Sequence, residues 1–378
     1  MTERRLAMID VKPGTAMESQ SGLNQKWPKI YGAYRLPAAK PRVAAIICHP
    51  TSNFMNHYLI DPLADRGIAC MGLNTRYAGN DVTLLMERAI QDLGAGVRWW
   101  REQGVEKVAL VGNSGGASLA ALYQSQAERL SIDATVDGRP IDLVPQDLPP
   151  ADGISLCGAH PGRAITLSEW LDPALLDEAD PDGIDPALDL YDPSNGPPYT
   201  TEFLQRFRAA QAERYRRLEE WVWARLRMLR DRATAPGDEA FIVYRTHADP
   251  RFLDLSLDAN DREAGGIWGP PKAVNEAANA MGRFTTLTAF LSQFSSASCA
   301  DGPRRLAETS IPVQLLDYTA DQSVFPSSIA AWRAAIDGRA AGGKADLHVI
   351  KGGNHYLAGQ PDLVATVADR IAGFAEAL

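Results

Sequence analysis

Short apolar runs alternate with amphipathic segments along most of this chain, and this alternation constrains the fold more than any other feature of the sequence. The runs Val43–Cys48, Lys107–Val111 and Gly153–Cys157 have the length and aliphatic character of strands that are buried on both faces. Residues 82–100 instead repeat apolar side chains at helical spacing. Strands that alternate with helices predict an α/β fold, in which a mostly parallel sheet carries helices on both faces.

The same pattern places elements over the rest of the chain. The first 25 residues are polar and weakly patterned, which predicts an arm that leads into an edge strand near Lys29–Arg35. The further strands are expected at Val43–Cys48, Ile68–Leu73, Lys107–Val111, Gly153–Cys157, Pro312–Leu316 and Leu347–Ile350, and the helices at Asn56–Arg66, 82–100, Ala117–Ala127, Ser328–Ile336 and Asp362–Ala375.

The alternation is interrupted over residues 161–310. Residues 171–199 are rich in Asp and Pro, which predicts loops, whereas Thr201–Arg232 has the pattern of one long helix. A short strand at Glu239–Tyr244 and a helix near 282–295 are also expected. An interruption of this length is too long for a loop. We therefore predict a core domain of residues 1–160 and 311–378, and a largely helical cap, residues 161–310, inserted between two strands of the sheet.

Composition excludes several classes of function. The 378 residues carry a net charge of −9, which argues against broad nucleic-acid binding. No stretch approaches the roughly 18 apolar residues of a membrane span, and the start of the chain lacks the apolar run of a signal peptide. The four cysteines have no C-x-x-C spacing and read as reduced residues, three of them in apolar strand runs. We expect a cytoplasmic protein that binds neither nucleic acid nor membrane. The cysteines are Cys48, Cys70, Cys157 and Cys299.

The strongest local signal is the pentapeptide Gly112-Asn113-Ser114-Gly115-Gly116, which has the pattern G-x-S-x-G. It lies directly between a predicted strand and a predicted helix, where a tight turn strains the backbone of the serine and bulky neighbours would clash. In this context the segment resembles the nucleophile elbow of the α/β-hydrolase fold family. The resemblance covers roughly residues 29–160 and 311–378, and it does not extend to the inserted residues.

The resemblance implies a serine nucleophile followed along the chain by an acid and then a histidine. Ser114 would be the nucleophile, and His355, in a glycine-rich loop after the strand Leu347–Ile350, would be the general base. Asp321, in the loop after Pro312–Leu316, would be the acid that orients the histidine. Asp317 is the alternative acid, but it lies nearer the strand end and reads as structural. His348 lies within the last strand and reads as a strand residue.

The family also holds the oxyanion of the reaction with two backbone N–H groups. The first would come from Gly115, the residue after the nucleophile, and the second from Thr51, in the loop that begins His49-Pro-Thr-Ser. Proline at position 50 replaces the usual glycine, so Ser52 is an alternative donor. His49 itself reads as an orienting residue more than as a proton carrier.

Several polar and aromatic residues follow strands at the carboxyl edge of the predicted sheet or lie in the insert, where they could contact a substrate. Metal-ligand spacing is absent from the sequence, and so are a P-loop and a G-x-G-x-x-G after a strand, so we expect neither a metal nor another cofactor. The candidate substrate-binding residues are His49, Ser52, Asn53, His160, Trp170 and His247.

These features predict a serine hydrolase that cleaves a carboxylic ester of a small to medium, partly apolar substrate through an acyl-enzyme. A carbon–carbon bond hydrolase acting on a diketone, a thioesterase or a lactonase would use the same triad. An alternative of another class is a non-catalytic ligand-binding protein on the hydrolase fold. The insert could also mediate the formation of a homodimer.

Overall fold

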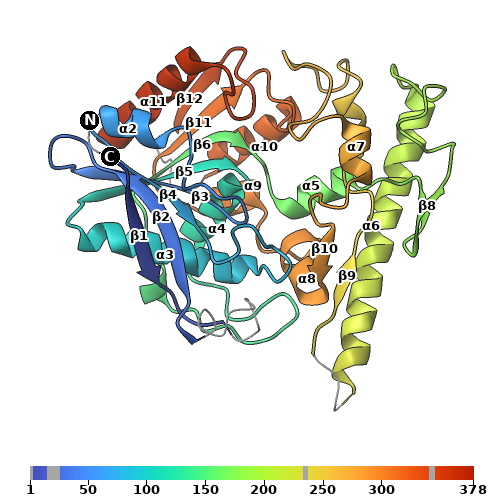
Figure 1. The fold of residues 1–378 in the computed structure, drawn as a ribbon, viewed down its shortest axis with the longest axis horizontal. Helices are drawn as coiled ribbons and strands as arrows, with labels where there is room; N and C mark the ends of the chain where they lie inside the picture. Colours follow the sequence, from blue (N-terminus) through green and yellow to red (C-terminus); the bar gives the residue numbers. More distant parts are fainter. Residues whose placement is uncertain (1–2, 15–25, 233–236, 340–344) are drawn as a thin grey trace.

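The computed structural model describes residues 3–14, 26–232, 237–339 and 345–378, and its centre is an eight-stranded sheet (Figure 1). The strand order is β1-β2-β4-β3-β5-β6-β11-β12. β2 runs antiparallel to both of its neighbours, and every pair from β4 to β12 is parallel. The strands are β1 (Arg5–Asp10), β2 (Lys29–Arg35), β3 (Val43–His49), β4 (Ala69–Asn74), β5 (Lys107–Ser114), β6 (Gly153–Ala159), β11 (Val313–Tyr318) and β12 (Ala345–Ile350).

Helices cover both faces of this sheet, as the alternation in the sequence predicts. The central strands are buried on both sides, and successive side chains of β3 enter two different apolar clusters. One cluster lies under α3, α4, α9 and α10, and the other lies under α2 and α11. These helices are α2 (Ile60–Asp65), α3 (Met86–Glu102), α4 (Gly116–Glu128), α9 (Gly302–Ala307), α10 (Pro326–Asp337) and α11 (Pro361–Glu376).

The start of the chain differs from the prediction. Arg5–Asp10 forms β1, the outermost strand, so β2 is the second strand of the sheet and not its edge. Pairing with β2 buries Ala7 and Ile9 and leaves Leu6 exposed. This alternation marks a half-buried strand, which the polar residues around it obscure. The remainder of the predicted arm lies partly outside the described residues, at 15–25.

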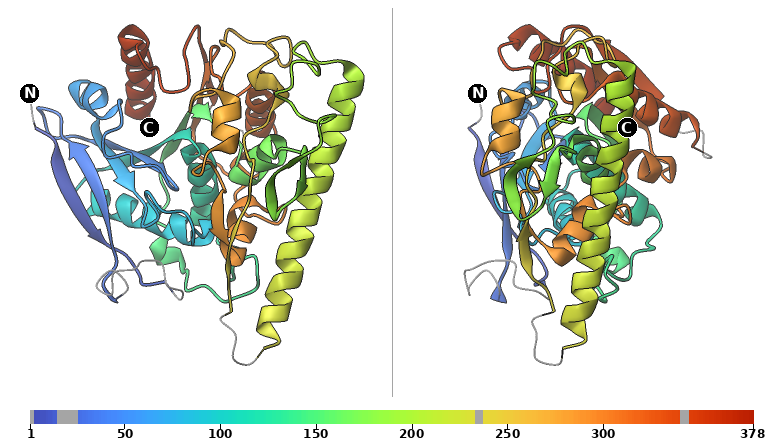
Figure 2. Two further views of the ribbon diagram at one scale, coloured as in Figure 1. Left: turned by 45° about the vertical axis from the view of Figure 1, so that its right-hand side comes forward. Right: turned by 90° about the vertical axis from the view of Figure 1, so that its right-hand side faces the viewer.

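The chain between β6 and β11, residues 160–312, is the inserted segment, and most of it lies on the opposite side of the molecule from β1 (Figures 1 and 2). Its long helix α6 (Thr201–Arg230) packs an apolar stripe against α8 and buries Leu218 and Val222 with Phe290. The predicted loops at 171–199 contain a short hairpin. The other elements are α5 (Arg163–Trp170), β7 (Leu175–Asp177), β8 (Asp180–Ile184), β9 (Ala240–Ile242), α7 (Pro271–Glu276), β10 (Phe284–Thr286) and α8 (Leu287–Phe294).

One helix of the inserted segment belongs spatially to the layers of the sheet. α9 packs closely against α4 and α10, so the helical layer on that face includes chain that precedes residue 311. No helix among the described residues is long and apolar enough to cross a bilayer. The three cysteines predicted to lie in strands are indeed buried in β3, β4 and β6, and all four cysteines are free.

The turn between β5 and α4 brings α4 against the end of β3. A Cβ atom on Gly116, the first residue of α4, would overlap the carbonyl oxygen of Cys48. Both partners are main chain, so neither can move aside without displacing an element. Only glycine allows this close approach.

We predict that Gly116→Ala lowers the free energy of unfolding by at least about 2 kcal/mol, because the added methyl group overpacks a backbone contact. Chemical denaturation monitored by circular dichroism measures this. The matched control is Gly373→Ala in α11, where the site is exposed and an added Cβ meets nothing within 4 Å. The control should be neutral or slightly stabilising. Equal stability of the two variants would contradict the close approach.

Candidate active site

Ser114 is the last residue of β5, and its backbone lies in the left-handed region with φ 57°. The pairing of β5 with β6 shifts register between Asn113 and Ser114, which marks the point where the strand turns away from the sheet. The carbonyl of Ser114 accepts a hydrogen bond from the N–H of His160 at 3.2 Å. The strained serine predicted by the G-x-S-x-G pattern is therefore present, held between strand and helix.

Buried hydrogen bonds hold Asn113, the residue that precedes Ser114 in the elbow. The N–H of Leu59 donates to Nδ1 of His57 at 3.3 Å, so the ring proton lies on Nε2, which is 3.1 Å from Oδ1 of Asn113. The amide of Asn113 then donates to the carbonyl of Cys157 at 2.8 Å. Burial lowers the pKa of His57 to about 4, so the ring is neutral. His57 thus fixes the residue before the serine and does not line the cavity.

The structure brings together the three residues that the sequence predicts as a triad. Oγ of Ser114 is 3.0 Å from Nε2 of His355, and Nδ1 of His355 is 2.8 Å from Oδ2 of Asp321. All three side chains are buried, with exposed fractions of 5% for Ser114, 1% for Asp321 and 2% for His355. Ser114 ends β5, and Asp321 and His355 lie in the loops after β11 and β12, so the parallel strands bring all three to one edge of the sheet.

The Asp321 carboxylate is fully bonded on the side away from the histidine. Its Oδ1 accepts the N–H of Ser323 at 2.8 Å and the N–H of Val324 at 2.9 Å. Burial by itself raises the pKa of this carboxyl, but the nearby His355 and these hydrogen bonds outweigh it and hold the pKa below its usual value. An ionised carboxylate at Nδ1 keeps the proton there and leaves Nε2 free to accept one from Ser114.

Asp317 and His348, which were predicted to be structural, lie elsewhere. Asp317 lies within β11 and pairs with Arg333 at 3.2 Å. His348 lies in β12, where its Nε2 is 2.7 Å from Asp346. Neither is hydrogen bonded to the Ser114 group.

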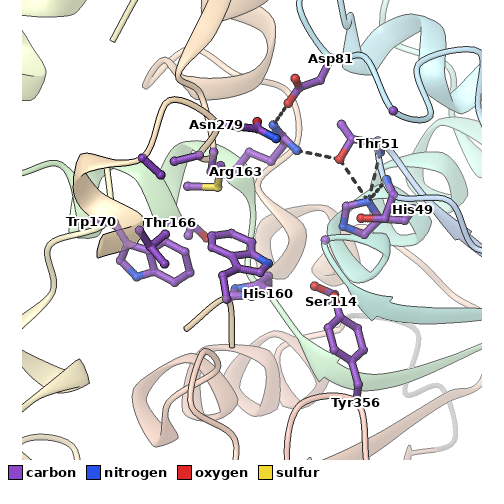
Figure 3. Close-up of a pocket in the computed structure, with 18 of the residues that line it drawn as sticks. His49, Thr51, Asp81, Ser114, His160, Arg163, Thr166, Trp170, Asn279 and Tyr356 are labelled. Carbon is purple, nitrogen blue, oxygen red and sulfur yellow. Dashed lines mark hydrogen bonds and ion pairs between the residues drawn. The ribbon is translucent and has the colours of Figure 1, made fainter. Parts of the chain in front are cut away.

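A cavity of about 670 Å³ opens over Ser114 (Figure 3). Most of the predicted binding residues line it, together with both predicted oxyanion residues. Part of its wall was not predicted, although Arg163 follows the same strand as His160. The predicted residues that line the cavity are His49, Thr51, Ser52, Gly115, His160 and Trp170, and the missed ones include Asp81, Arg163, Val274, Met281 and Tyr356.

Two predicted binding residues do not line the cavity. Oδ1 of Asn53 accepts hydrogen bonds from the side chain of Asn74 and from the N–H of Met55, so this side chain stabilises its own loop. His247 lies behind Trp170, stacked on Phe252 with ring centroids 4.4 Å apart. Neither side chain is among those that line the cavity, so a substrate contact by these two residues stays a prediction.

The N–H of Thr51, the predicted oxyanion donor, is hydrogen bonded to a side chain in this structure. Its N–H donates to Nδ1 of His49 at 3.1 Å, and the N–H of the alternative, Ser52, donates to the same atom at 2.8 Å. Both amides are therefore occupied by the histidine side chain. The sequence could not reveal this, because it depends on the path of the loop after Pro50.

An ion pair between buried Arg163 and partly exposed Asp81 lies in the cavity wall. Nη2 of Arg163 pairs with Asp81, and its Nη1 is 3.3 Å from Oγ1 of Thr51 (Figure 3). Burial lowers the pKa of Arg163, and the carboxylate of Asp81 opposes that effect. The guanidinium also lies 4.8 Å from the ring centroid of Phe294. Across the described part of the chain, no three His, Cys, Asp or Glu side chains gather as a metal site would need.

Comparisons with family models and with curated proteins found no match. Solved structures are similar throughout their length. A protein named DcsB, solved with its substrate analogue, is 12% identical with a TM-score of 0.53, and the match covers 98% of this chain and 99% of that one. A thermostable carboxyl esterase from Bacillus coagulans is 12% identical, with 98% of each chain covered and a TM-score of 0.49, and an esterase domain from Rhodothermus marinus has the same identity and coverage with a TM-score of 0.46.

The strand order, the elbow between β5 and α4 and this structural similarity agree with one another. The chain has the α/β-hydrolase fold, as the sequence predicts. At 12% identity the similarity concerns the fold alone.

His247 gives a testable consequence of burial. Both ring nitrogens are buried without a hydrogen-bond partner among the described residues, and burial lowers the pKa to about 4. An unfolded histidine has a pKa near 6.5, so the unfolded chain binds the proton more tightly. The contribution of neutral His247 to the free energy of unfolding is therefore complete above pH 6.5, and it is lost as the pH falls toward 4.

We predict that His247→Phe removes the contribution of this residue, on the order of 3 kcal/mol of destabilisation between pH 7 and pH 4, and so makes the pH dependence less steep. Urea denaturation at several pH values measures it. Trp268→Phe is the control, since Trp268 contacts the same ring but does not titrate. If wild type and His247→Phe lose stability in parallel as the pH falls, the buried neutral histidine is not the cause.

Proposed function

We propose that the protein is a serine hydrolase that cleaves a carboxylic ester of a small to medium, partly apolar substrate. The observation that carries the proposal is the hydrogen-bonded line from Asp321 through His355 to Ser114, which ends at the cavity. A serine hydroxyl is a poor nucleophile unless a base removes its proton. Here a buried, oriented histidine lies at hydrogen-bond distance from it.

In the proposed mechanism, Oγ of Ser114 attacks the ester carbonyl while Nε2 of His355 takes the hydroxyl proton. The tetrahedral intermediate then collapses, and His355 returns the proton to the departing alcohol oxygen. Water attacks the resulting acyl-enzyme, again with His355 as base, and frees the acid and Ser114. Asp321 remains ionised throughout and stabilises the imidazolium, which agrees with its lowered pKa.

The cavity wall supports an uncharged, partly apolar substrate. The inserted segment contributes Trp170, Val274 and Met281 to the wall of the cavity. The charge of Arg163 is balanced by Asp81, and His160 is neutral because burial and the nearby His355 lower its pKa to about 3. We propose on these grounds that residues 161–310 act as a cap that closes over a discrete substrate.

The location and the assembly state stay predictions. Free cysteines support a cytoplasmic location, because oxidising compartments favour disulfides. A homodimer formed through the inserted segment is also a prediction, and a measurement of molecular mass in solution tests it.

The test is turnover of p-nitrophenyl esters of increasing acyl length by wild type and Ser114→Ala. We expect wild-type turnover and a loss of at least about 1000-fold in kcat for the variant, because no other group supplies the nucleophile. Neutral esters should be preferred over esters with a carboxylate on the acyl chain. Ser194→Ala, at an exposed serine of the inserted segment, is the matched control and should turn over like wild type.

Other outcomes separate the alternatives. Cleavage of a diketone, a thioester or a lactone in preference to every ester would move the assignment to a hydrolase of that bond with the same triad. A folded wild type that cleaves none of these would indicate a ligand-binding protein and would overturn the proposal.

A further inference from the structure

The predicted oxyanion site retains only one of its two donors. The N–H of Gly115 lies at the start of α4 beside Ser114, but the N–H groups of Thr51 and Ser52 both point at Nδ1 of His49. A tetrahedral intermediate stabilised by a single donor would lose a large part of the electrostatic stabilisation that this chemistry needs. The proposed reaction therefore calls for another donor at the cavity wall.

The bonds to His49 determine where its proton lies. A ring nitrogen that accepts an N–H bond carries no proton of its own, and Nδ1 accepts two. The proton of the neutral ring is therefore on Nε2. Burial, with Arg163 and the neighbouring histidines His160, His355 and His57, holds the pKa of His49 well below its ordinary value, so the ring is neutral. The backbone thus fixes one tautomer, with Nε2–H as a donor.

The position of Nε2 suits this role. A Cβ atom on Gly115 would lie only 2.8 Å from Nε2 of His49, so the ring edge lies against the residue that supplies the first donor. In the part of the chain that is described, no side chain or main-chain group hydrogen bonds to Nε2. His49, Gly115 and Ser114 line the same cavity (Figure 3).

We propose that Nε2–H of His49 is the second oxyanion donor, acting with the N–H of Gly115. This inference rests on the proposed ester hydrolysis. His49 transfers no proton: its N–H donates a hydrogen bond to the carbonyl oxygen, which strengthens as charge develops there, and His355 carries every proton. Arg163 holds the loop in place through Oγ1 of Thr51. The role also explains glycine at position 115, since any side chain would push the ring away.

Two substitutions separate this role from a purely structural one. The amide nitrogen of glutamine can reach the position of Nε2, whereas the oxygen of asparagine can take the position of Nδ1 and accept the two loop N–H groups. We expect His49→Asn to lower kcat by about 100-fold or more with KM within a few-fold of wild type. We expect His49→Gln to retain kcat within about 10-fold. A role confined to holding the loop predicts the reverse order.

Thermal unfolding shows whether both variants fold. If one does not, a measurement on the wild type replaces the comparison of kcat between the two variants. In protein labelled with ¹⁵N-histidine, NMR should show His49 protonated at Nε2, and this proton should shift downfield when a fluorophosphonate forms its adduct, because the phosphonyl oxygen occupies the oxyanion site. A proton on Nδ1, or no shift on adduct formation, would overturn the inference.

The outcomes for the two proposals are distinct. If wild type neither turns over esters nor forms the adduct, the proposed function itself fails. If wild type is active and His49→Asn equals or exceeds His49→Gln, the function stands and only the role of His49 falls.

Discussion

The contact between the start of α4 and the end of β3 is the constraint on which the rest of the site depends. Gly116 lies so close to the carbonyl of Cys48 that the two elements are fixed relative to each other. That contact sets Ser114 at the end of β5 beside His49, the last residue of β3. The nucleophile and the loop at residues 49–53 are thus parts of one rigid unit, which is what a preorganised site requires.

The remaining groups reach this unit because parallel strands end at one edge of the sheet. β11 and β12 lie beyond β6, and their loops carry Asp321 and His355 to the same side as Ser114. Main-chain donors hold two side chains of the site: two amides bond the Asp321 carboxylate, and two bond the ring of His49. Amides fixed by the fold orient these side chains with little loss of entropy when substrate binds.

The sequence predicts the features of this arrangement that depend on local patterns, and it does not predict those that depend on contacts between distant residues. Apolar periodicity reports burial, so the central strands and their helices were predictable. The elbow pattern with its strand and helix context located Ser114, and the residue order that the family resemblance implies led to Asp321 and His355. β1 was missed because a half-buried edge strand has only a short alternating signal. The hydrogen bond from the Thr51 amide to His49 depends on the path of its loop, and the burial of His247 depends on contacts within the inserted segment. No local sequence pattern encodes either.

The central claim is that the fold activates one particular serine. The most direct measurement is peptide mapping by mass spectrometry after wild type reacts with a fluorophosphonate. The account predicts a single adduct, on Ser114, formed much more slowly in Asp321→Asn because the histidine would lose its orienting partner. An adduct on any other serine, or a folded protein that stays unlabelled, would contradict it.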